Sequence, residues 1–211
     1  RADKEVVMEA VGSNPSALQY ADDILKKDPE IVMQQKWIQK ITEDWKLVEF
    51  QNAPKNVRAN KWVVKAAIRK NPKAFLYAEG GLKANEEIVM EAVKQNGSVL
   101  AHVMGGLRKN VRVVLAAVRS DGSALAYAEG GLKANEVIVK EAIRNDFKAL
   151  YFADDWIKEN PKFMLEAVKQ NGMALQYAKG GLRANRRVVK AAVKKDGRAL
   201  QYAGPNLKKD P

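Results

Sequence analysis

The sequence contains no cysteine and only one histidine among its 211 residues. Without cysteine there are no disulfide bonds and no thiolate metal sites, and a solitary His102 excludes most hydrolase and zinc chemistries. Long hydrophobic runs are also missing, since the longest apolar stretch covers only residues 113–118. A membrane-spanning helix needs roughly 18 to 20 apolar residues, so we expect no segment that crosses a bilayer.

Targeting information is also missing from the sequence. The chain shows no initiator methionine and no signal sequence, but a trimmed chain would have lost both. The absence of cysteine does not identify a compartment either. We expect a soluble or peripheral protein in an intracellular or organellar setting.

What the sequence does contain is a repeat with a spacing of 25 residues. Each unit carries V-V-x-x-A-V followed by N-G-x-A-L-x-Y-A, and position 1 is the Asn or Asp that opens it. Repeats 1 to 8 begin at Asp3, Asp28, Asn60, Asn85, Asn110, Asn135, Asn160 and Asn185, and repeat 2 is enlarged by seven residues. This periodicity predicts a single helical repeat array over residues 1–211 rather than one globular domain.

Both ends of the chain fall inside the repeat pattern. Asp210-Pro211 restarts it as Asp28-Pro29 does, and Arg1-Ala2-Asp3 resembles residues 183–185. We therefore expect the chain to be a segment of a longer protein.

The pattern inside each repeat is helical. Positions 4, 5, 8 and 9 are apolar, which places them on one face of a first helix of about 11 residues. The opening Asn or Asp suits an N-cap, and the Asn-Gly or Asp-Gly that follows the helix predicts a left-handed residue closing it. A shorter second helix is expected over A-L-x-Y-A, ending at Gly-Gly in four repeats. The predicted fold class is an all-α solenoid, a superhelix of short two-helix repeats in which each unit buries its apolar face against its neighbours.

The pattern D-x-x-V-V-x-x-A-V-x-x-N-G-x-A-L-x-Y-A-x-x-x-L-K resembles a family of short helix-pair repeats, a domain of unknown function that occurs in tandem in algal, protist and some intracellular bacterial proteins. The resemblance covers almost the whole chain. It implies the helical repeat fold but no activity, cofactor or catalytic residues. Repeat 2 departs from the family pattern through its seven extra residues.

Two columns of basic residues recur along the repeats. Position 24 is Lys or Arg in every repeat, and position 10 is basic in six of them. Such columns could form a track for phosphates, acidic protein segments or anionic headgroups. The alternative is that a cation in the last turn of a helix only complements the helix dipole, and we favour this alternative.

The net charge of +12 is distributed unevenly, with +9 in residues 160–211. Arg187, Lys190 and Lys194 follow i, i+3, i+7 spacing on one helix face of repeat 8. This end is the best candidate for binding an acidic partner, although it could also be a solvated terminal face. The candidate residues are Arg183, Arg186, Arg187, Lys190, Lys194, Lys195 and Arg198.

Three tryptophans, Trp37, Trp45 and Trp62, fall in or beside the irregular repeat 2. Aromatic anchors are frequent at protein interfaces, so they form a second candidate docking site, with Trp37 as the exposed member. The alternative is structural: residues 38, 41, 45 and 48 follow helical spacing, and a first helix lengthened by about two turns would bury them.

Three further motifs have structural interpretations that we favour over functional ones. The Gly-Gly motifs look superficially like phosphate cradles, but helix C-caps explain them. His102 occupies a slot that is Tyr in most repeats, which predicts a packing residue. Asp22-Asp23 and Asp154-Asp155 are expected to be solvent-facing caps.

These observations predict a non-enzymatic protein, without cofactor or metal. We expect a protein-binding scaffold or an accessory or linker subunit of a larger assembly, with a partner that carries an acidic surface. The alternative is an anion-binding module for nucleic acid or an anionic membrane surface. We rank it lower because the Tyr column is expected in the core, where it could not stack on bases.

Overall fold

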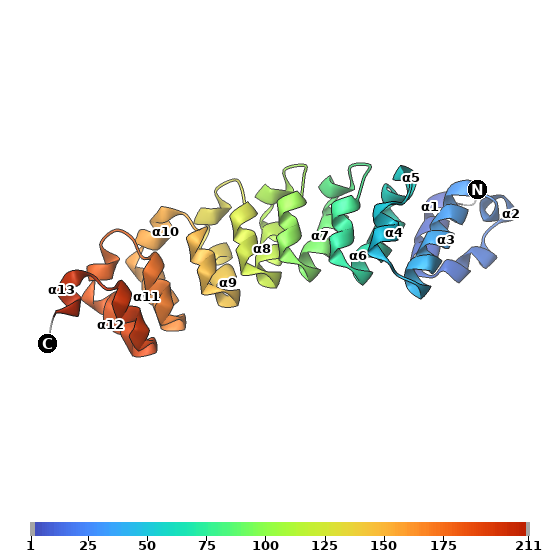
Figure 1. Ribbon diagram of the computed structural model, residues 1–211. Coiled ribbons are helices and arrows are strands. Elements are labelled where there is room, and N and C mark those ends of the chain that lie inside the picture. The colour runs from blue at the N-terminus through green and yellow to red at the C-terminus, as the bar shows by residue number, and fades with distance from the viewer. Residues whose placement is uncertain (1–2, 210–211) are drawn as a thin grey trace. The chain divides into compact units, whose positions relative to one another are not determined.

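The computed structural model describes residues 3–209, so the predicted pattern at Arg1-Ala2 and Asp210-Pro211 lies outside the described residues. Within this range every regular element is helical and no strand is present (Figure 1). The predicted fold class, an all-α repeat solenoid, is confirmed. The described chain divides into two compact units. Whether all repeats form one array stays a prediction.

Unit 1 comprises residues up to 95 together with 102–105, and it holds the first three repeats and the first helix of repeat 4. Its elements are α1 (Lys4–Ser13), η1 (Pro15–Tyr20), α2 (Asp23–Lys26), α3 (Pro29–Glu43), α4 (Leu47–Gln51), α5 (Lys55–Arg58), α6 (Lys61–Lys70), η2 (Pro72–Tyr77), η3 (Leu82–Ala84) and α7 (Glu86–Gln95), where η denotes a 3₁₀ helix.

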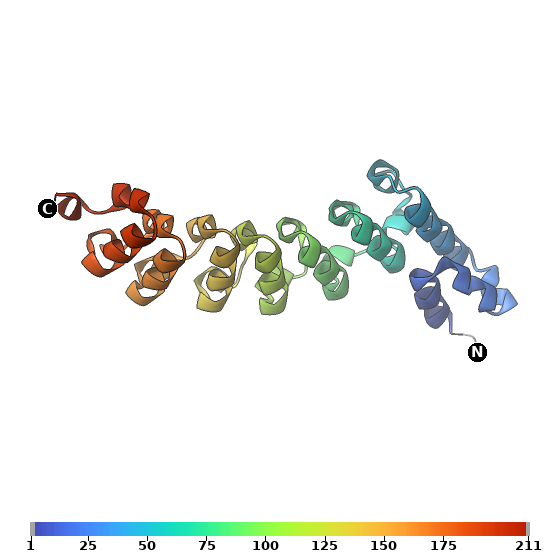
Figure 2. The same ribbon diagram turned by 90° about the horizontal axis from the view of Figure 1, so that it is seen from below.

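Unit 2 comprises residues 96–101 and those from 106 onward. In Figure 2 its longer α-helices follow one another in chain order. The elements are η4 (Gly97–His102), η5 (Leu107–Lys109), α8 (Val111–Ser120), η6 (Gly122–Tyr127), η7 (Leu132–Ala134), α9 (Glu136–Asn145), η8 (Phe147–Tyr151), α10 (Asp155–Glu159), α11 (Pro161–Gln170), η9 (Gly172–Tyr177), η10 (Leu182–Ala184), α12 (Arg186–Lys195), η11 (Gly197–Tyr202) and α13 (Pro205–Lys208).

A regular repeat contains three helical segments rather than the predicted two. The first is an α-helix of ten residues, such as α9, whose cap Asn135 accepts hydrogen bonds from the N–H groups of Val137 and Ile138. The second, over A-L-x-Y, is a 3₁₀ helix of six residues such as η6. The third is a single 3₁₀ turn such as η7. The predicted N-caps are confirmed, whereas the second helix is 3₁₀ rather than α, as is common for short segments.

The glycine of the Asn-Gly and Asp-Gly pairs has a different role from the predicted one. It does not adopt a left-handed conformation, and the residue before it is extended, as at Asp121. Gly122 instead lies against the next repeat, where an added Cβ would be 2.5 Å from the carbonyl oxygen of Ala142. Gly97 and Gly172 lie in the same way against Ala117 and Ala192. This glycine is therefore needed for close approach between repeats, not for helix closure.

The Gly-Gly pairs do adopt positive φ angles, +61° and +77° at Gly80 and Gly81. The preceding 3₁₀ helix has already ended at Tyr77, so the pair does not close it as predicted. Gly81 instead opens the third segment η3. Where Gly-Gly is absent, in repeats 1, 2, 6 and 8, the third segment is a short α-helix: α2, α5, α10 or α13.

Neighbouring repeats are joined by one recurring backbone hydrogen bond. The N–H of position 20 in one repeat donates to the carbonyl of position 24 in the repeat before it, as from Glu129 to Arg108 at 2.9 Å. The same bond recurs in both units, and the other donors are Glu79, Met104, Asp154, Lys179 and Gly204. Stacking is thus supported by the backbone as well as by side chains.

The core follows the predicted apolar positions. In α9, positions 4, 5, 8 and 9 are Ile138, Val139, Ala142 and Ile143, and all four are buried. In the enlarged repeat 2, α3 is lengthened to 15 residues and buries Ile38 and Ile41. It ends before Trp45 and Val48, so the predicted continuation of this helix across them is wrong. The extra residues lengthen α3 and form the connection over residues 44–46, and α4 takes the place of the second segment.

Candidate protein-interaction surface

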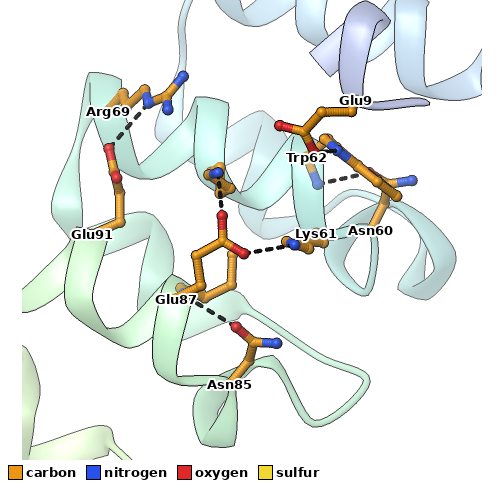
Figure 3. A network of polar contacts seen from close by, with 10 residues as sticks. Glu9, Asn60, Lys61, Trp62, Arg69, Asn85, Glu87 and Glu91 are labelled. Atoms are coloured by element: carbon orange, nitrogen blue, oxygen red, sulfur yellow. Dashed lines mark hydrogen bonds and ion pairs between the residues drawn. The ribbon is translucent and has the colours of Figure 1, made fainter. Parts of the chain in front are cut away.

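The side chains that join adjacent repeats follow a charge rule that is clearest between α6 and α7 (Figure 3). Glu87, at position 3 of α7's repeat, accepts ion pairs from Lys61 at 2.6 Å and Lys65 at 2.5 Å. Glu91, at position 7, pairs with Arg69 Nε at 3.0 Å. Cations at positions 2, 6 and 10 of one repeat thus bind carboxylates at positions 3 and 7 of the next.

These contacts change the ionisation of the groups involved. Hydrogen bonds from Lys61 and Lys65 lower the pKa of the Glu87 carboxyl to about 2. The hydrogen bond to Glu87 raises the pKa of Lys61 in turn. Two cations sharing one carboxylate stabilise its charged form, so the pair remains ionised at neutral pH.

The same directional pairing recurs in other junctions within each unit. In unit 1, Lys4 at position 2 binds Glu30 at position 3 of the next repeat, at 2.9 Å. In unit 2 the pairs are Arg119 with Glu141 at 3.0 Å and Lys140 with Glu166 at 2.7 Å. In these junctions, the side of a first helix that faces the following repeat carries cations, and the opposing side of that repeat carries the carboxylates that pair with them.

On α12, the first helix of repeat 8, positions 2, 6 and 10 are all basic: Arg186, Lys190 and Lys194. We call them the α12 cationic row. Lys190 and Lys194 are exposed, and neither forms an ion pair with any residue in the range 3–209. Lys190 and Lys194 thus lack the carboxylates that pair with their equivalents Lys65 and Arg69 on α6.

The row lies beside a stacking face that is uncovered in unit 2. Leu200 is 42% exposed, whereas its equivalents in the preceding repeats, Leu150 and Leu175, are fully buried. Gly197 has no atom within 4 Å of an added Cβ, in contrast to Gly172. The α12 cationic row therefore adjoins apolar surface of the kind that joins repeats elsewhere.

Some residues of the predicted basic cluster bind groups within their own repeat, and others are exposed to solvent. The Arg183 Nε donates to the Ala178 carbonyl at 3.0 Å, so this side chain serves its own repeat. The Arg198 side chain donates two hydrogen bonds to Asp196, at 3.1 and 2.9 Å, and lowers the pKa of that carboxyl. Arg187 and Lys195 are exposed on α12 outside the row. Sequence reasoning grouped Arg187 with Lys190 and Lys194, but the charge rule selects Arg186 as their neighbour.

The basic column at position 24 is used within the fold. Arg58 donates to the carbonyl oxygens of Ala53 and Tyr77 and pairs with Glu79 at 3.2 Å. Lys158 is buried and pairs with Asp155 at 2.9 Å. Arg58 thus binds backbone carbonyls and a carboxylate, and Lys158 binds a carboxylate of its own repeat, which favours a structural role over a ligand track.

The tryptophans near repeat 2 are half-buried rather than exposed. Trp62 packs over Gly12 and donates from Nε1 to Glu9 at 2.7 Å, joining α6 to α1. Trp37 lies beneath Lys40, whose Nζ is 5.4 Å from the ring, so it is not the exposed member as predicted. Trp45 packs against Phe50 with ring centroids 6.1 Å apart. Each of the three contacts another part of the fold, and whether any of them docks a partner stays a prediction.

The exposed aromatic residues are others that sequence reasoning did not select. Trp156 on α10 is 46% exposed, and Tyr151 is 70% exposed. The expectation that the Tyr column lies in the core is therefore wrong at Tyr151, as it is at Tyr20 and Tyr127. His102, in the same slot, is also exposed rather than packed. This position follows the buried Leu of the same 3₁₀ helix by two residues. Because the helix has three residues per turn, the side chain at this position points away from the face that the Leu buries.

One junction in unit 2 departs from close packing. Position 13 of repeat 6 is Phe147 where its neighbours have glycine, and its ring packs against Tyr177 with centroids 6.3 Å apart. The Phe147 side chain leaves no room for the close approach of the next repeat's carbonyl that glycine allows. For this reason α9 and α11 lie less close together than α8 and α9. A groove of about 400 Å³ lies between them, lined by Lys140, Arg144, Phe163, Glu166, Lys169 and Gln170 among others.

The first aspartate of each predicted pair is a cap, whereas Asp23 and Asp155 lie in the first turn of the helix. Asp22 accepts a hydrogen bond from the N–H of Ile24, and Asp154 accepts one from the N–H of Trp156. Within residues 3–209, no group of three histidine or acidic side chains is placed to hold a metal ion. In the same range, no helix has both the length and the apolarity required to span a membrane.

Comparison with known proteins identifies a family match along most of the chain. A family model described as "Domain of unknown function (DUF4116)" matches residues 3–35, 63–108, 110–158 and 160–208. Each of the last three matches spans two of the 25-residue repeats. No curated protein and no solved structure matches the chain.

Proposed function

Because the chain belongs to this DUF4116 family of helical repeats, we propose that it is a non-enzymatic scaffold or accessory subunit that binds another protein through the α12 cationic row. The observation that carries the proposal is that Lys190 and Lys194 on α12 are exposed and form no ion pair with a described residue, whereas the equivalent Lys65 and Arg69 on α6 pair with Glu87 and Glu91. A protein surface that supplies those carboxylates would complete the pattern.

The charge rule also specifies the chemistry of the partner. In repeat 4 the two carboxylates come from one helix at i and i+4, which places them on the same face about 5 to 6 Å apart. We therefore propose an acidic helix as the bound element. Exposed ion pairs contribute only about 0.2 to 1 kcal/mol each, so burial of Leu200 and Val193 must supply much of the affinity. The charges set orientation and make the interaction sensitive to salt.

A second candidate is binding to nucleic acid, which the exposed aromatic side chains favour. Tyr127, Tyr151 and Trp156 in unit 2 are exposed and could stack on bases. The engagement of position-24 cations such as Arg108 with Glu129 argues against a continuous phosphate track. An anionic membrane surface would be bound by charge alone and without a preferred geometry.

A direct binding experiment separates these functions. Three fluorescent probes are titrated into the protein at about 50 mM and about 500 mM salt: an alanine-rich helical peptide with Glu at i and i+4, a DNA duplex, and vesicles containing phosphatidylserine. We expect the peptide to bind most tightly. The Lys190→Glu/Lys194→Glu variant should weaken peptide binding at least about tenfold, which is 1.4 kcal/mol.

The matched control changes Lys94 and Lys169 to Glu. Both are exposed position-10 residues without an ion pair in the described chain, so the net charge changes equally. This control should bind the peptide like the unmodified protein. Equal losses in the two variants would contradict a specific site, and tighter binding of DNA or vesicles would favour the alternative.

A further inference from the structure

The groove between α9 and α11, which we call the α9–α11 groove, lies inside unit 2, where repeats 6 and 7 both have described neighbours. Its apolar lining residues are Ile143, Phe163 and Ala167. Ile143 is 7% exposed, whereas the residues at the same position of repeats 5 and 7, Val118 and Val168, are fully buried. The groove therefore uncovers core surface that the junctions on either side cover.

Two contacts that bridge the preceding junction are missing at this groove. Between α8 and α9, Arg119 binds Glu141 at 3.0 Å, and the side-chain amide of Asn145 donates to the Arg119 carbonyl at 3.0 Å. The equivalent residues at the groove are Arg144 and Gln170. Arg144 instead binds Glu141 of its own helix at 3.0 Å. The Gln170 side chain has no hydrogen-bond partner within residues 3–209.

The charges around the groove explain why Arg144 has no partner across it. Position 3 of repeat 7 is Lys162, where repeat 4 has Glu87. Lys140, at position 6 of repeat 6, therefore binds Glu166 at 2.7 Å. This hydrogen bond raises the pKa of Lys140 and lowers that of Glu166. The carboxylate at position 7, which pairs with the position-10 cation in other junctions, is thus already bound to Lys140.

The groove consequently has a surplus of positive charge, with Lys140, Arg144 and Lys169 against the single carboxylate of Glu166. Lys169 is exposed and forms no ion pair within residues 3–209. Arg144 donates to Glu141 through Nη1, and its remaining N–H groups suit a further carboxylate. The amide of Gln170 carries both donors and an acceptor, which suits a peptide backbone rather than a lone anion.

We propose that the α9–α11 groove binds a short acidic segment of a partner protein. The segment inserts one large apolar side chain between α9 and α11 and places a carboxylate beside Arg144 and Lys169. The groove volume of about 400 Å³ lies at the lower end of the roughly 300 to 1,000 Å³ that is usual for ligand pockets. An apolar anchor in a pocket with a polar rim is the usual arrangement of a binding hot spot. The site does not involve the α12 cationic row, so it goes beyond the proposed function.

Fluorescence polarisation with the 211-residue chain tests the proposal. The probe is a labelled peptide with one Trp between two Glu residues. Two matched peptides replace the Trp with Ala or both Glu residues with Lys. At about 50 mM salt we expect the Trp-Glu peptide to bind at least about tenfold more tightly than either matched peptide. Equal binding of a matched peptide, or no binding of the Trp-Glu peptide up to about 1 mM, overturns the proposal.

Two variants of the protein locate the binding site. Phe147→Gly gives repeat 6 the glycine of its neighbours, so it should let α11 close against α9 and weaken binding at least about tenfold. Arg144→Glu changes an exposed residue and should weaken binding at least about fivefold. It therefore tests the proposal even where circular dichroism shows that Phe147→Gly fails to fold. The control Lys94→Glu changes the same position of repeat 4 and should bind like the unmodified chain. Unchanged binding by either folded variant contradicts the proposed site.

The Lys190→Glu/Lys194→Glu variant separates the groove from the α12 cationic row. This variant should bind the Trp-Glu peptide like the unmodified chain. Phe147→Gly should in turn retain binding of the alanine-rich peptide, which has no side chain large enough to fill the groove. If Lys190→Glu/Lys194→Glu abolishes binding of the Trp-Glu peptide, the groove is not its site and the proposed function stands alone.

Discussion

Replacing Gly122 with alanine tests whether close approach between repeats is the reason for glycine at position 13. An added Cβ would be 2.5 Å from the Ala142 carbonyl oxygen and 3.3 Å from the Asp146 nitrogen. The first distance is about 1 Å below an ordinary van der Waals separation. The same Ala142 carbonyl accepts the Asp146 N–H that ends α9, at 3.0 Å. Relief of the clash therefore requires movement of α9 or loss of that bond.

The chain provides its own control at Gly197. This glycine has the same place in repeat 8 and no left-handed φ angle, but no atom lies within 4 Å of its added Cβ. Overpacking typically costs about 1 to 3 kcal/mol, so Gly122→Ala should lower the free energy of unfolding by that amount. Gly197→Ala should instead raise it by about 0.4 to 1 kcal/mol, because alanine restricts the unfolded chain.

Urea unfolding followed by circular dichroism measures both effects through the midpoint and the slope of the transition. We expect the midpoint to fall for Gly122→Ala and to stay or rise for Gly197→Ala, with unchanged slopes. Equal destabilisation by both substitutions would refute the explanation, because it would show that the backbone conformation rather than the neighbouring carbonyl demands glycine.

Three further predictions test packing, charge pairing and the role of position 24. Ala142→Leu should destabilise by about 1 to 3 kcal/mol in the same assay, because Ala142 is fully buried, and no change would mean that the packed face is misassigned. Glu87 has a lowered pKa of about 2, so its contribution to stability is complete above its unfolded pKa of about 4.3 and disappears as the pH falls towards 2. Glu87→Gln should therefore flatten the fall in unfolding free energy across that pH window, and an unchanged slope would contradict the pairing. Arg58→Met should cost about 1 to 3 kcal/mol because it leaves the Ala53 and Tyr77 carbonyls without this donor, whereas the same change at the exposed Lys209 should have little effect.

Several features of the fold could be predicted from the sequence because they depend on local or periodic information. The apolar residues of α9 are buried where helical spacing placed them, and Asn135 caps that helix as its residue type indicated. An N-cap needs only backbone groups two or three residues away, so sequence proximity is sufficient. The 3₁₀ form of the second segment was missed because its residues are equally compatible with a short α-helix.

Sequence reasoning found all members of the α12 cationic row but could not separate them from engaged neighbours. Arg183 and Lys190 are equally basic in sequence, yet only Arg183 reaches carbonyl acceptors in its own repeat. The contacts of Trp62 could not be predicted for the same reason, since Glu9 and Gly12 approach it from a distant part of the chain.

The sequence by itself determined the 25-residue period, the helical class, the N-caps and the buried positions, because each follows from residues within one turn or one repeat. Only the tertiary structure decided which glycine meets a carbonyl, which cation meets a carboxylate and which face is left uncovered. Gly122 and Gly197 are alike in sequence and differ only in whether a neighbouring carbonyl lies over them. Such contacts depend on the distance between stacked repeats, and that distance is set by packing across the junction rather than by the residues of either repeat alone.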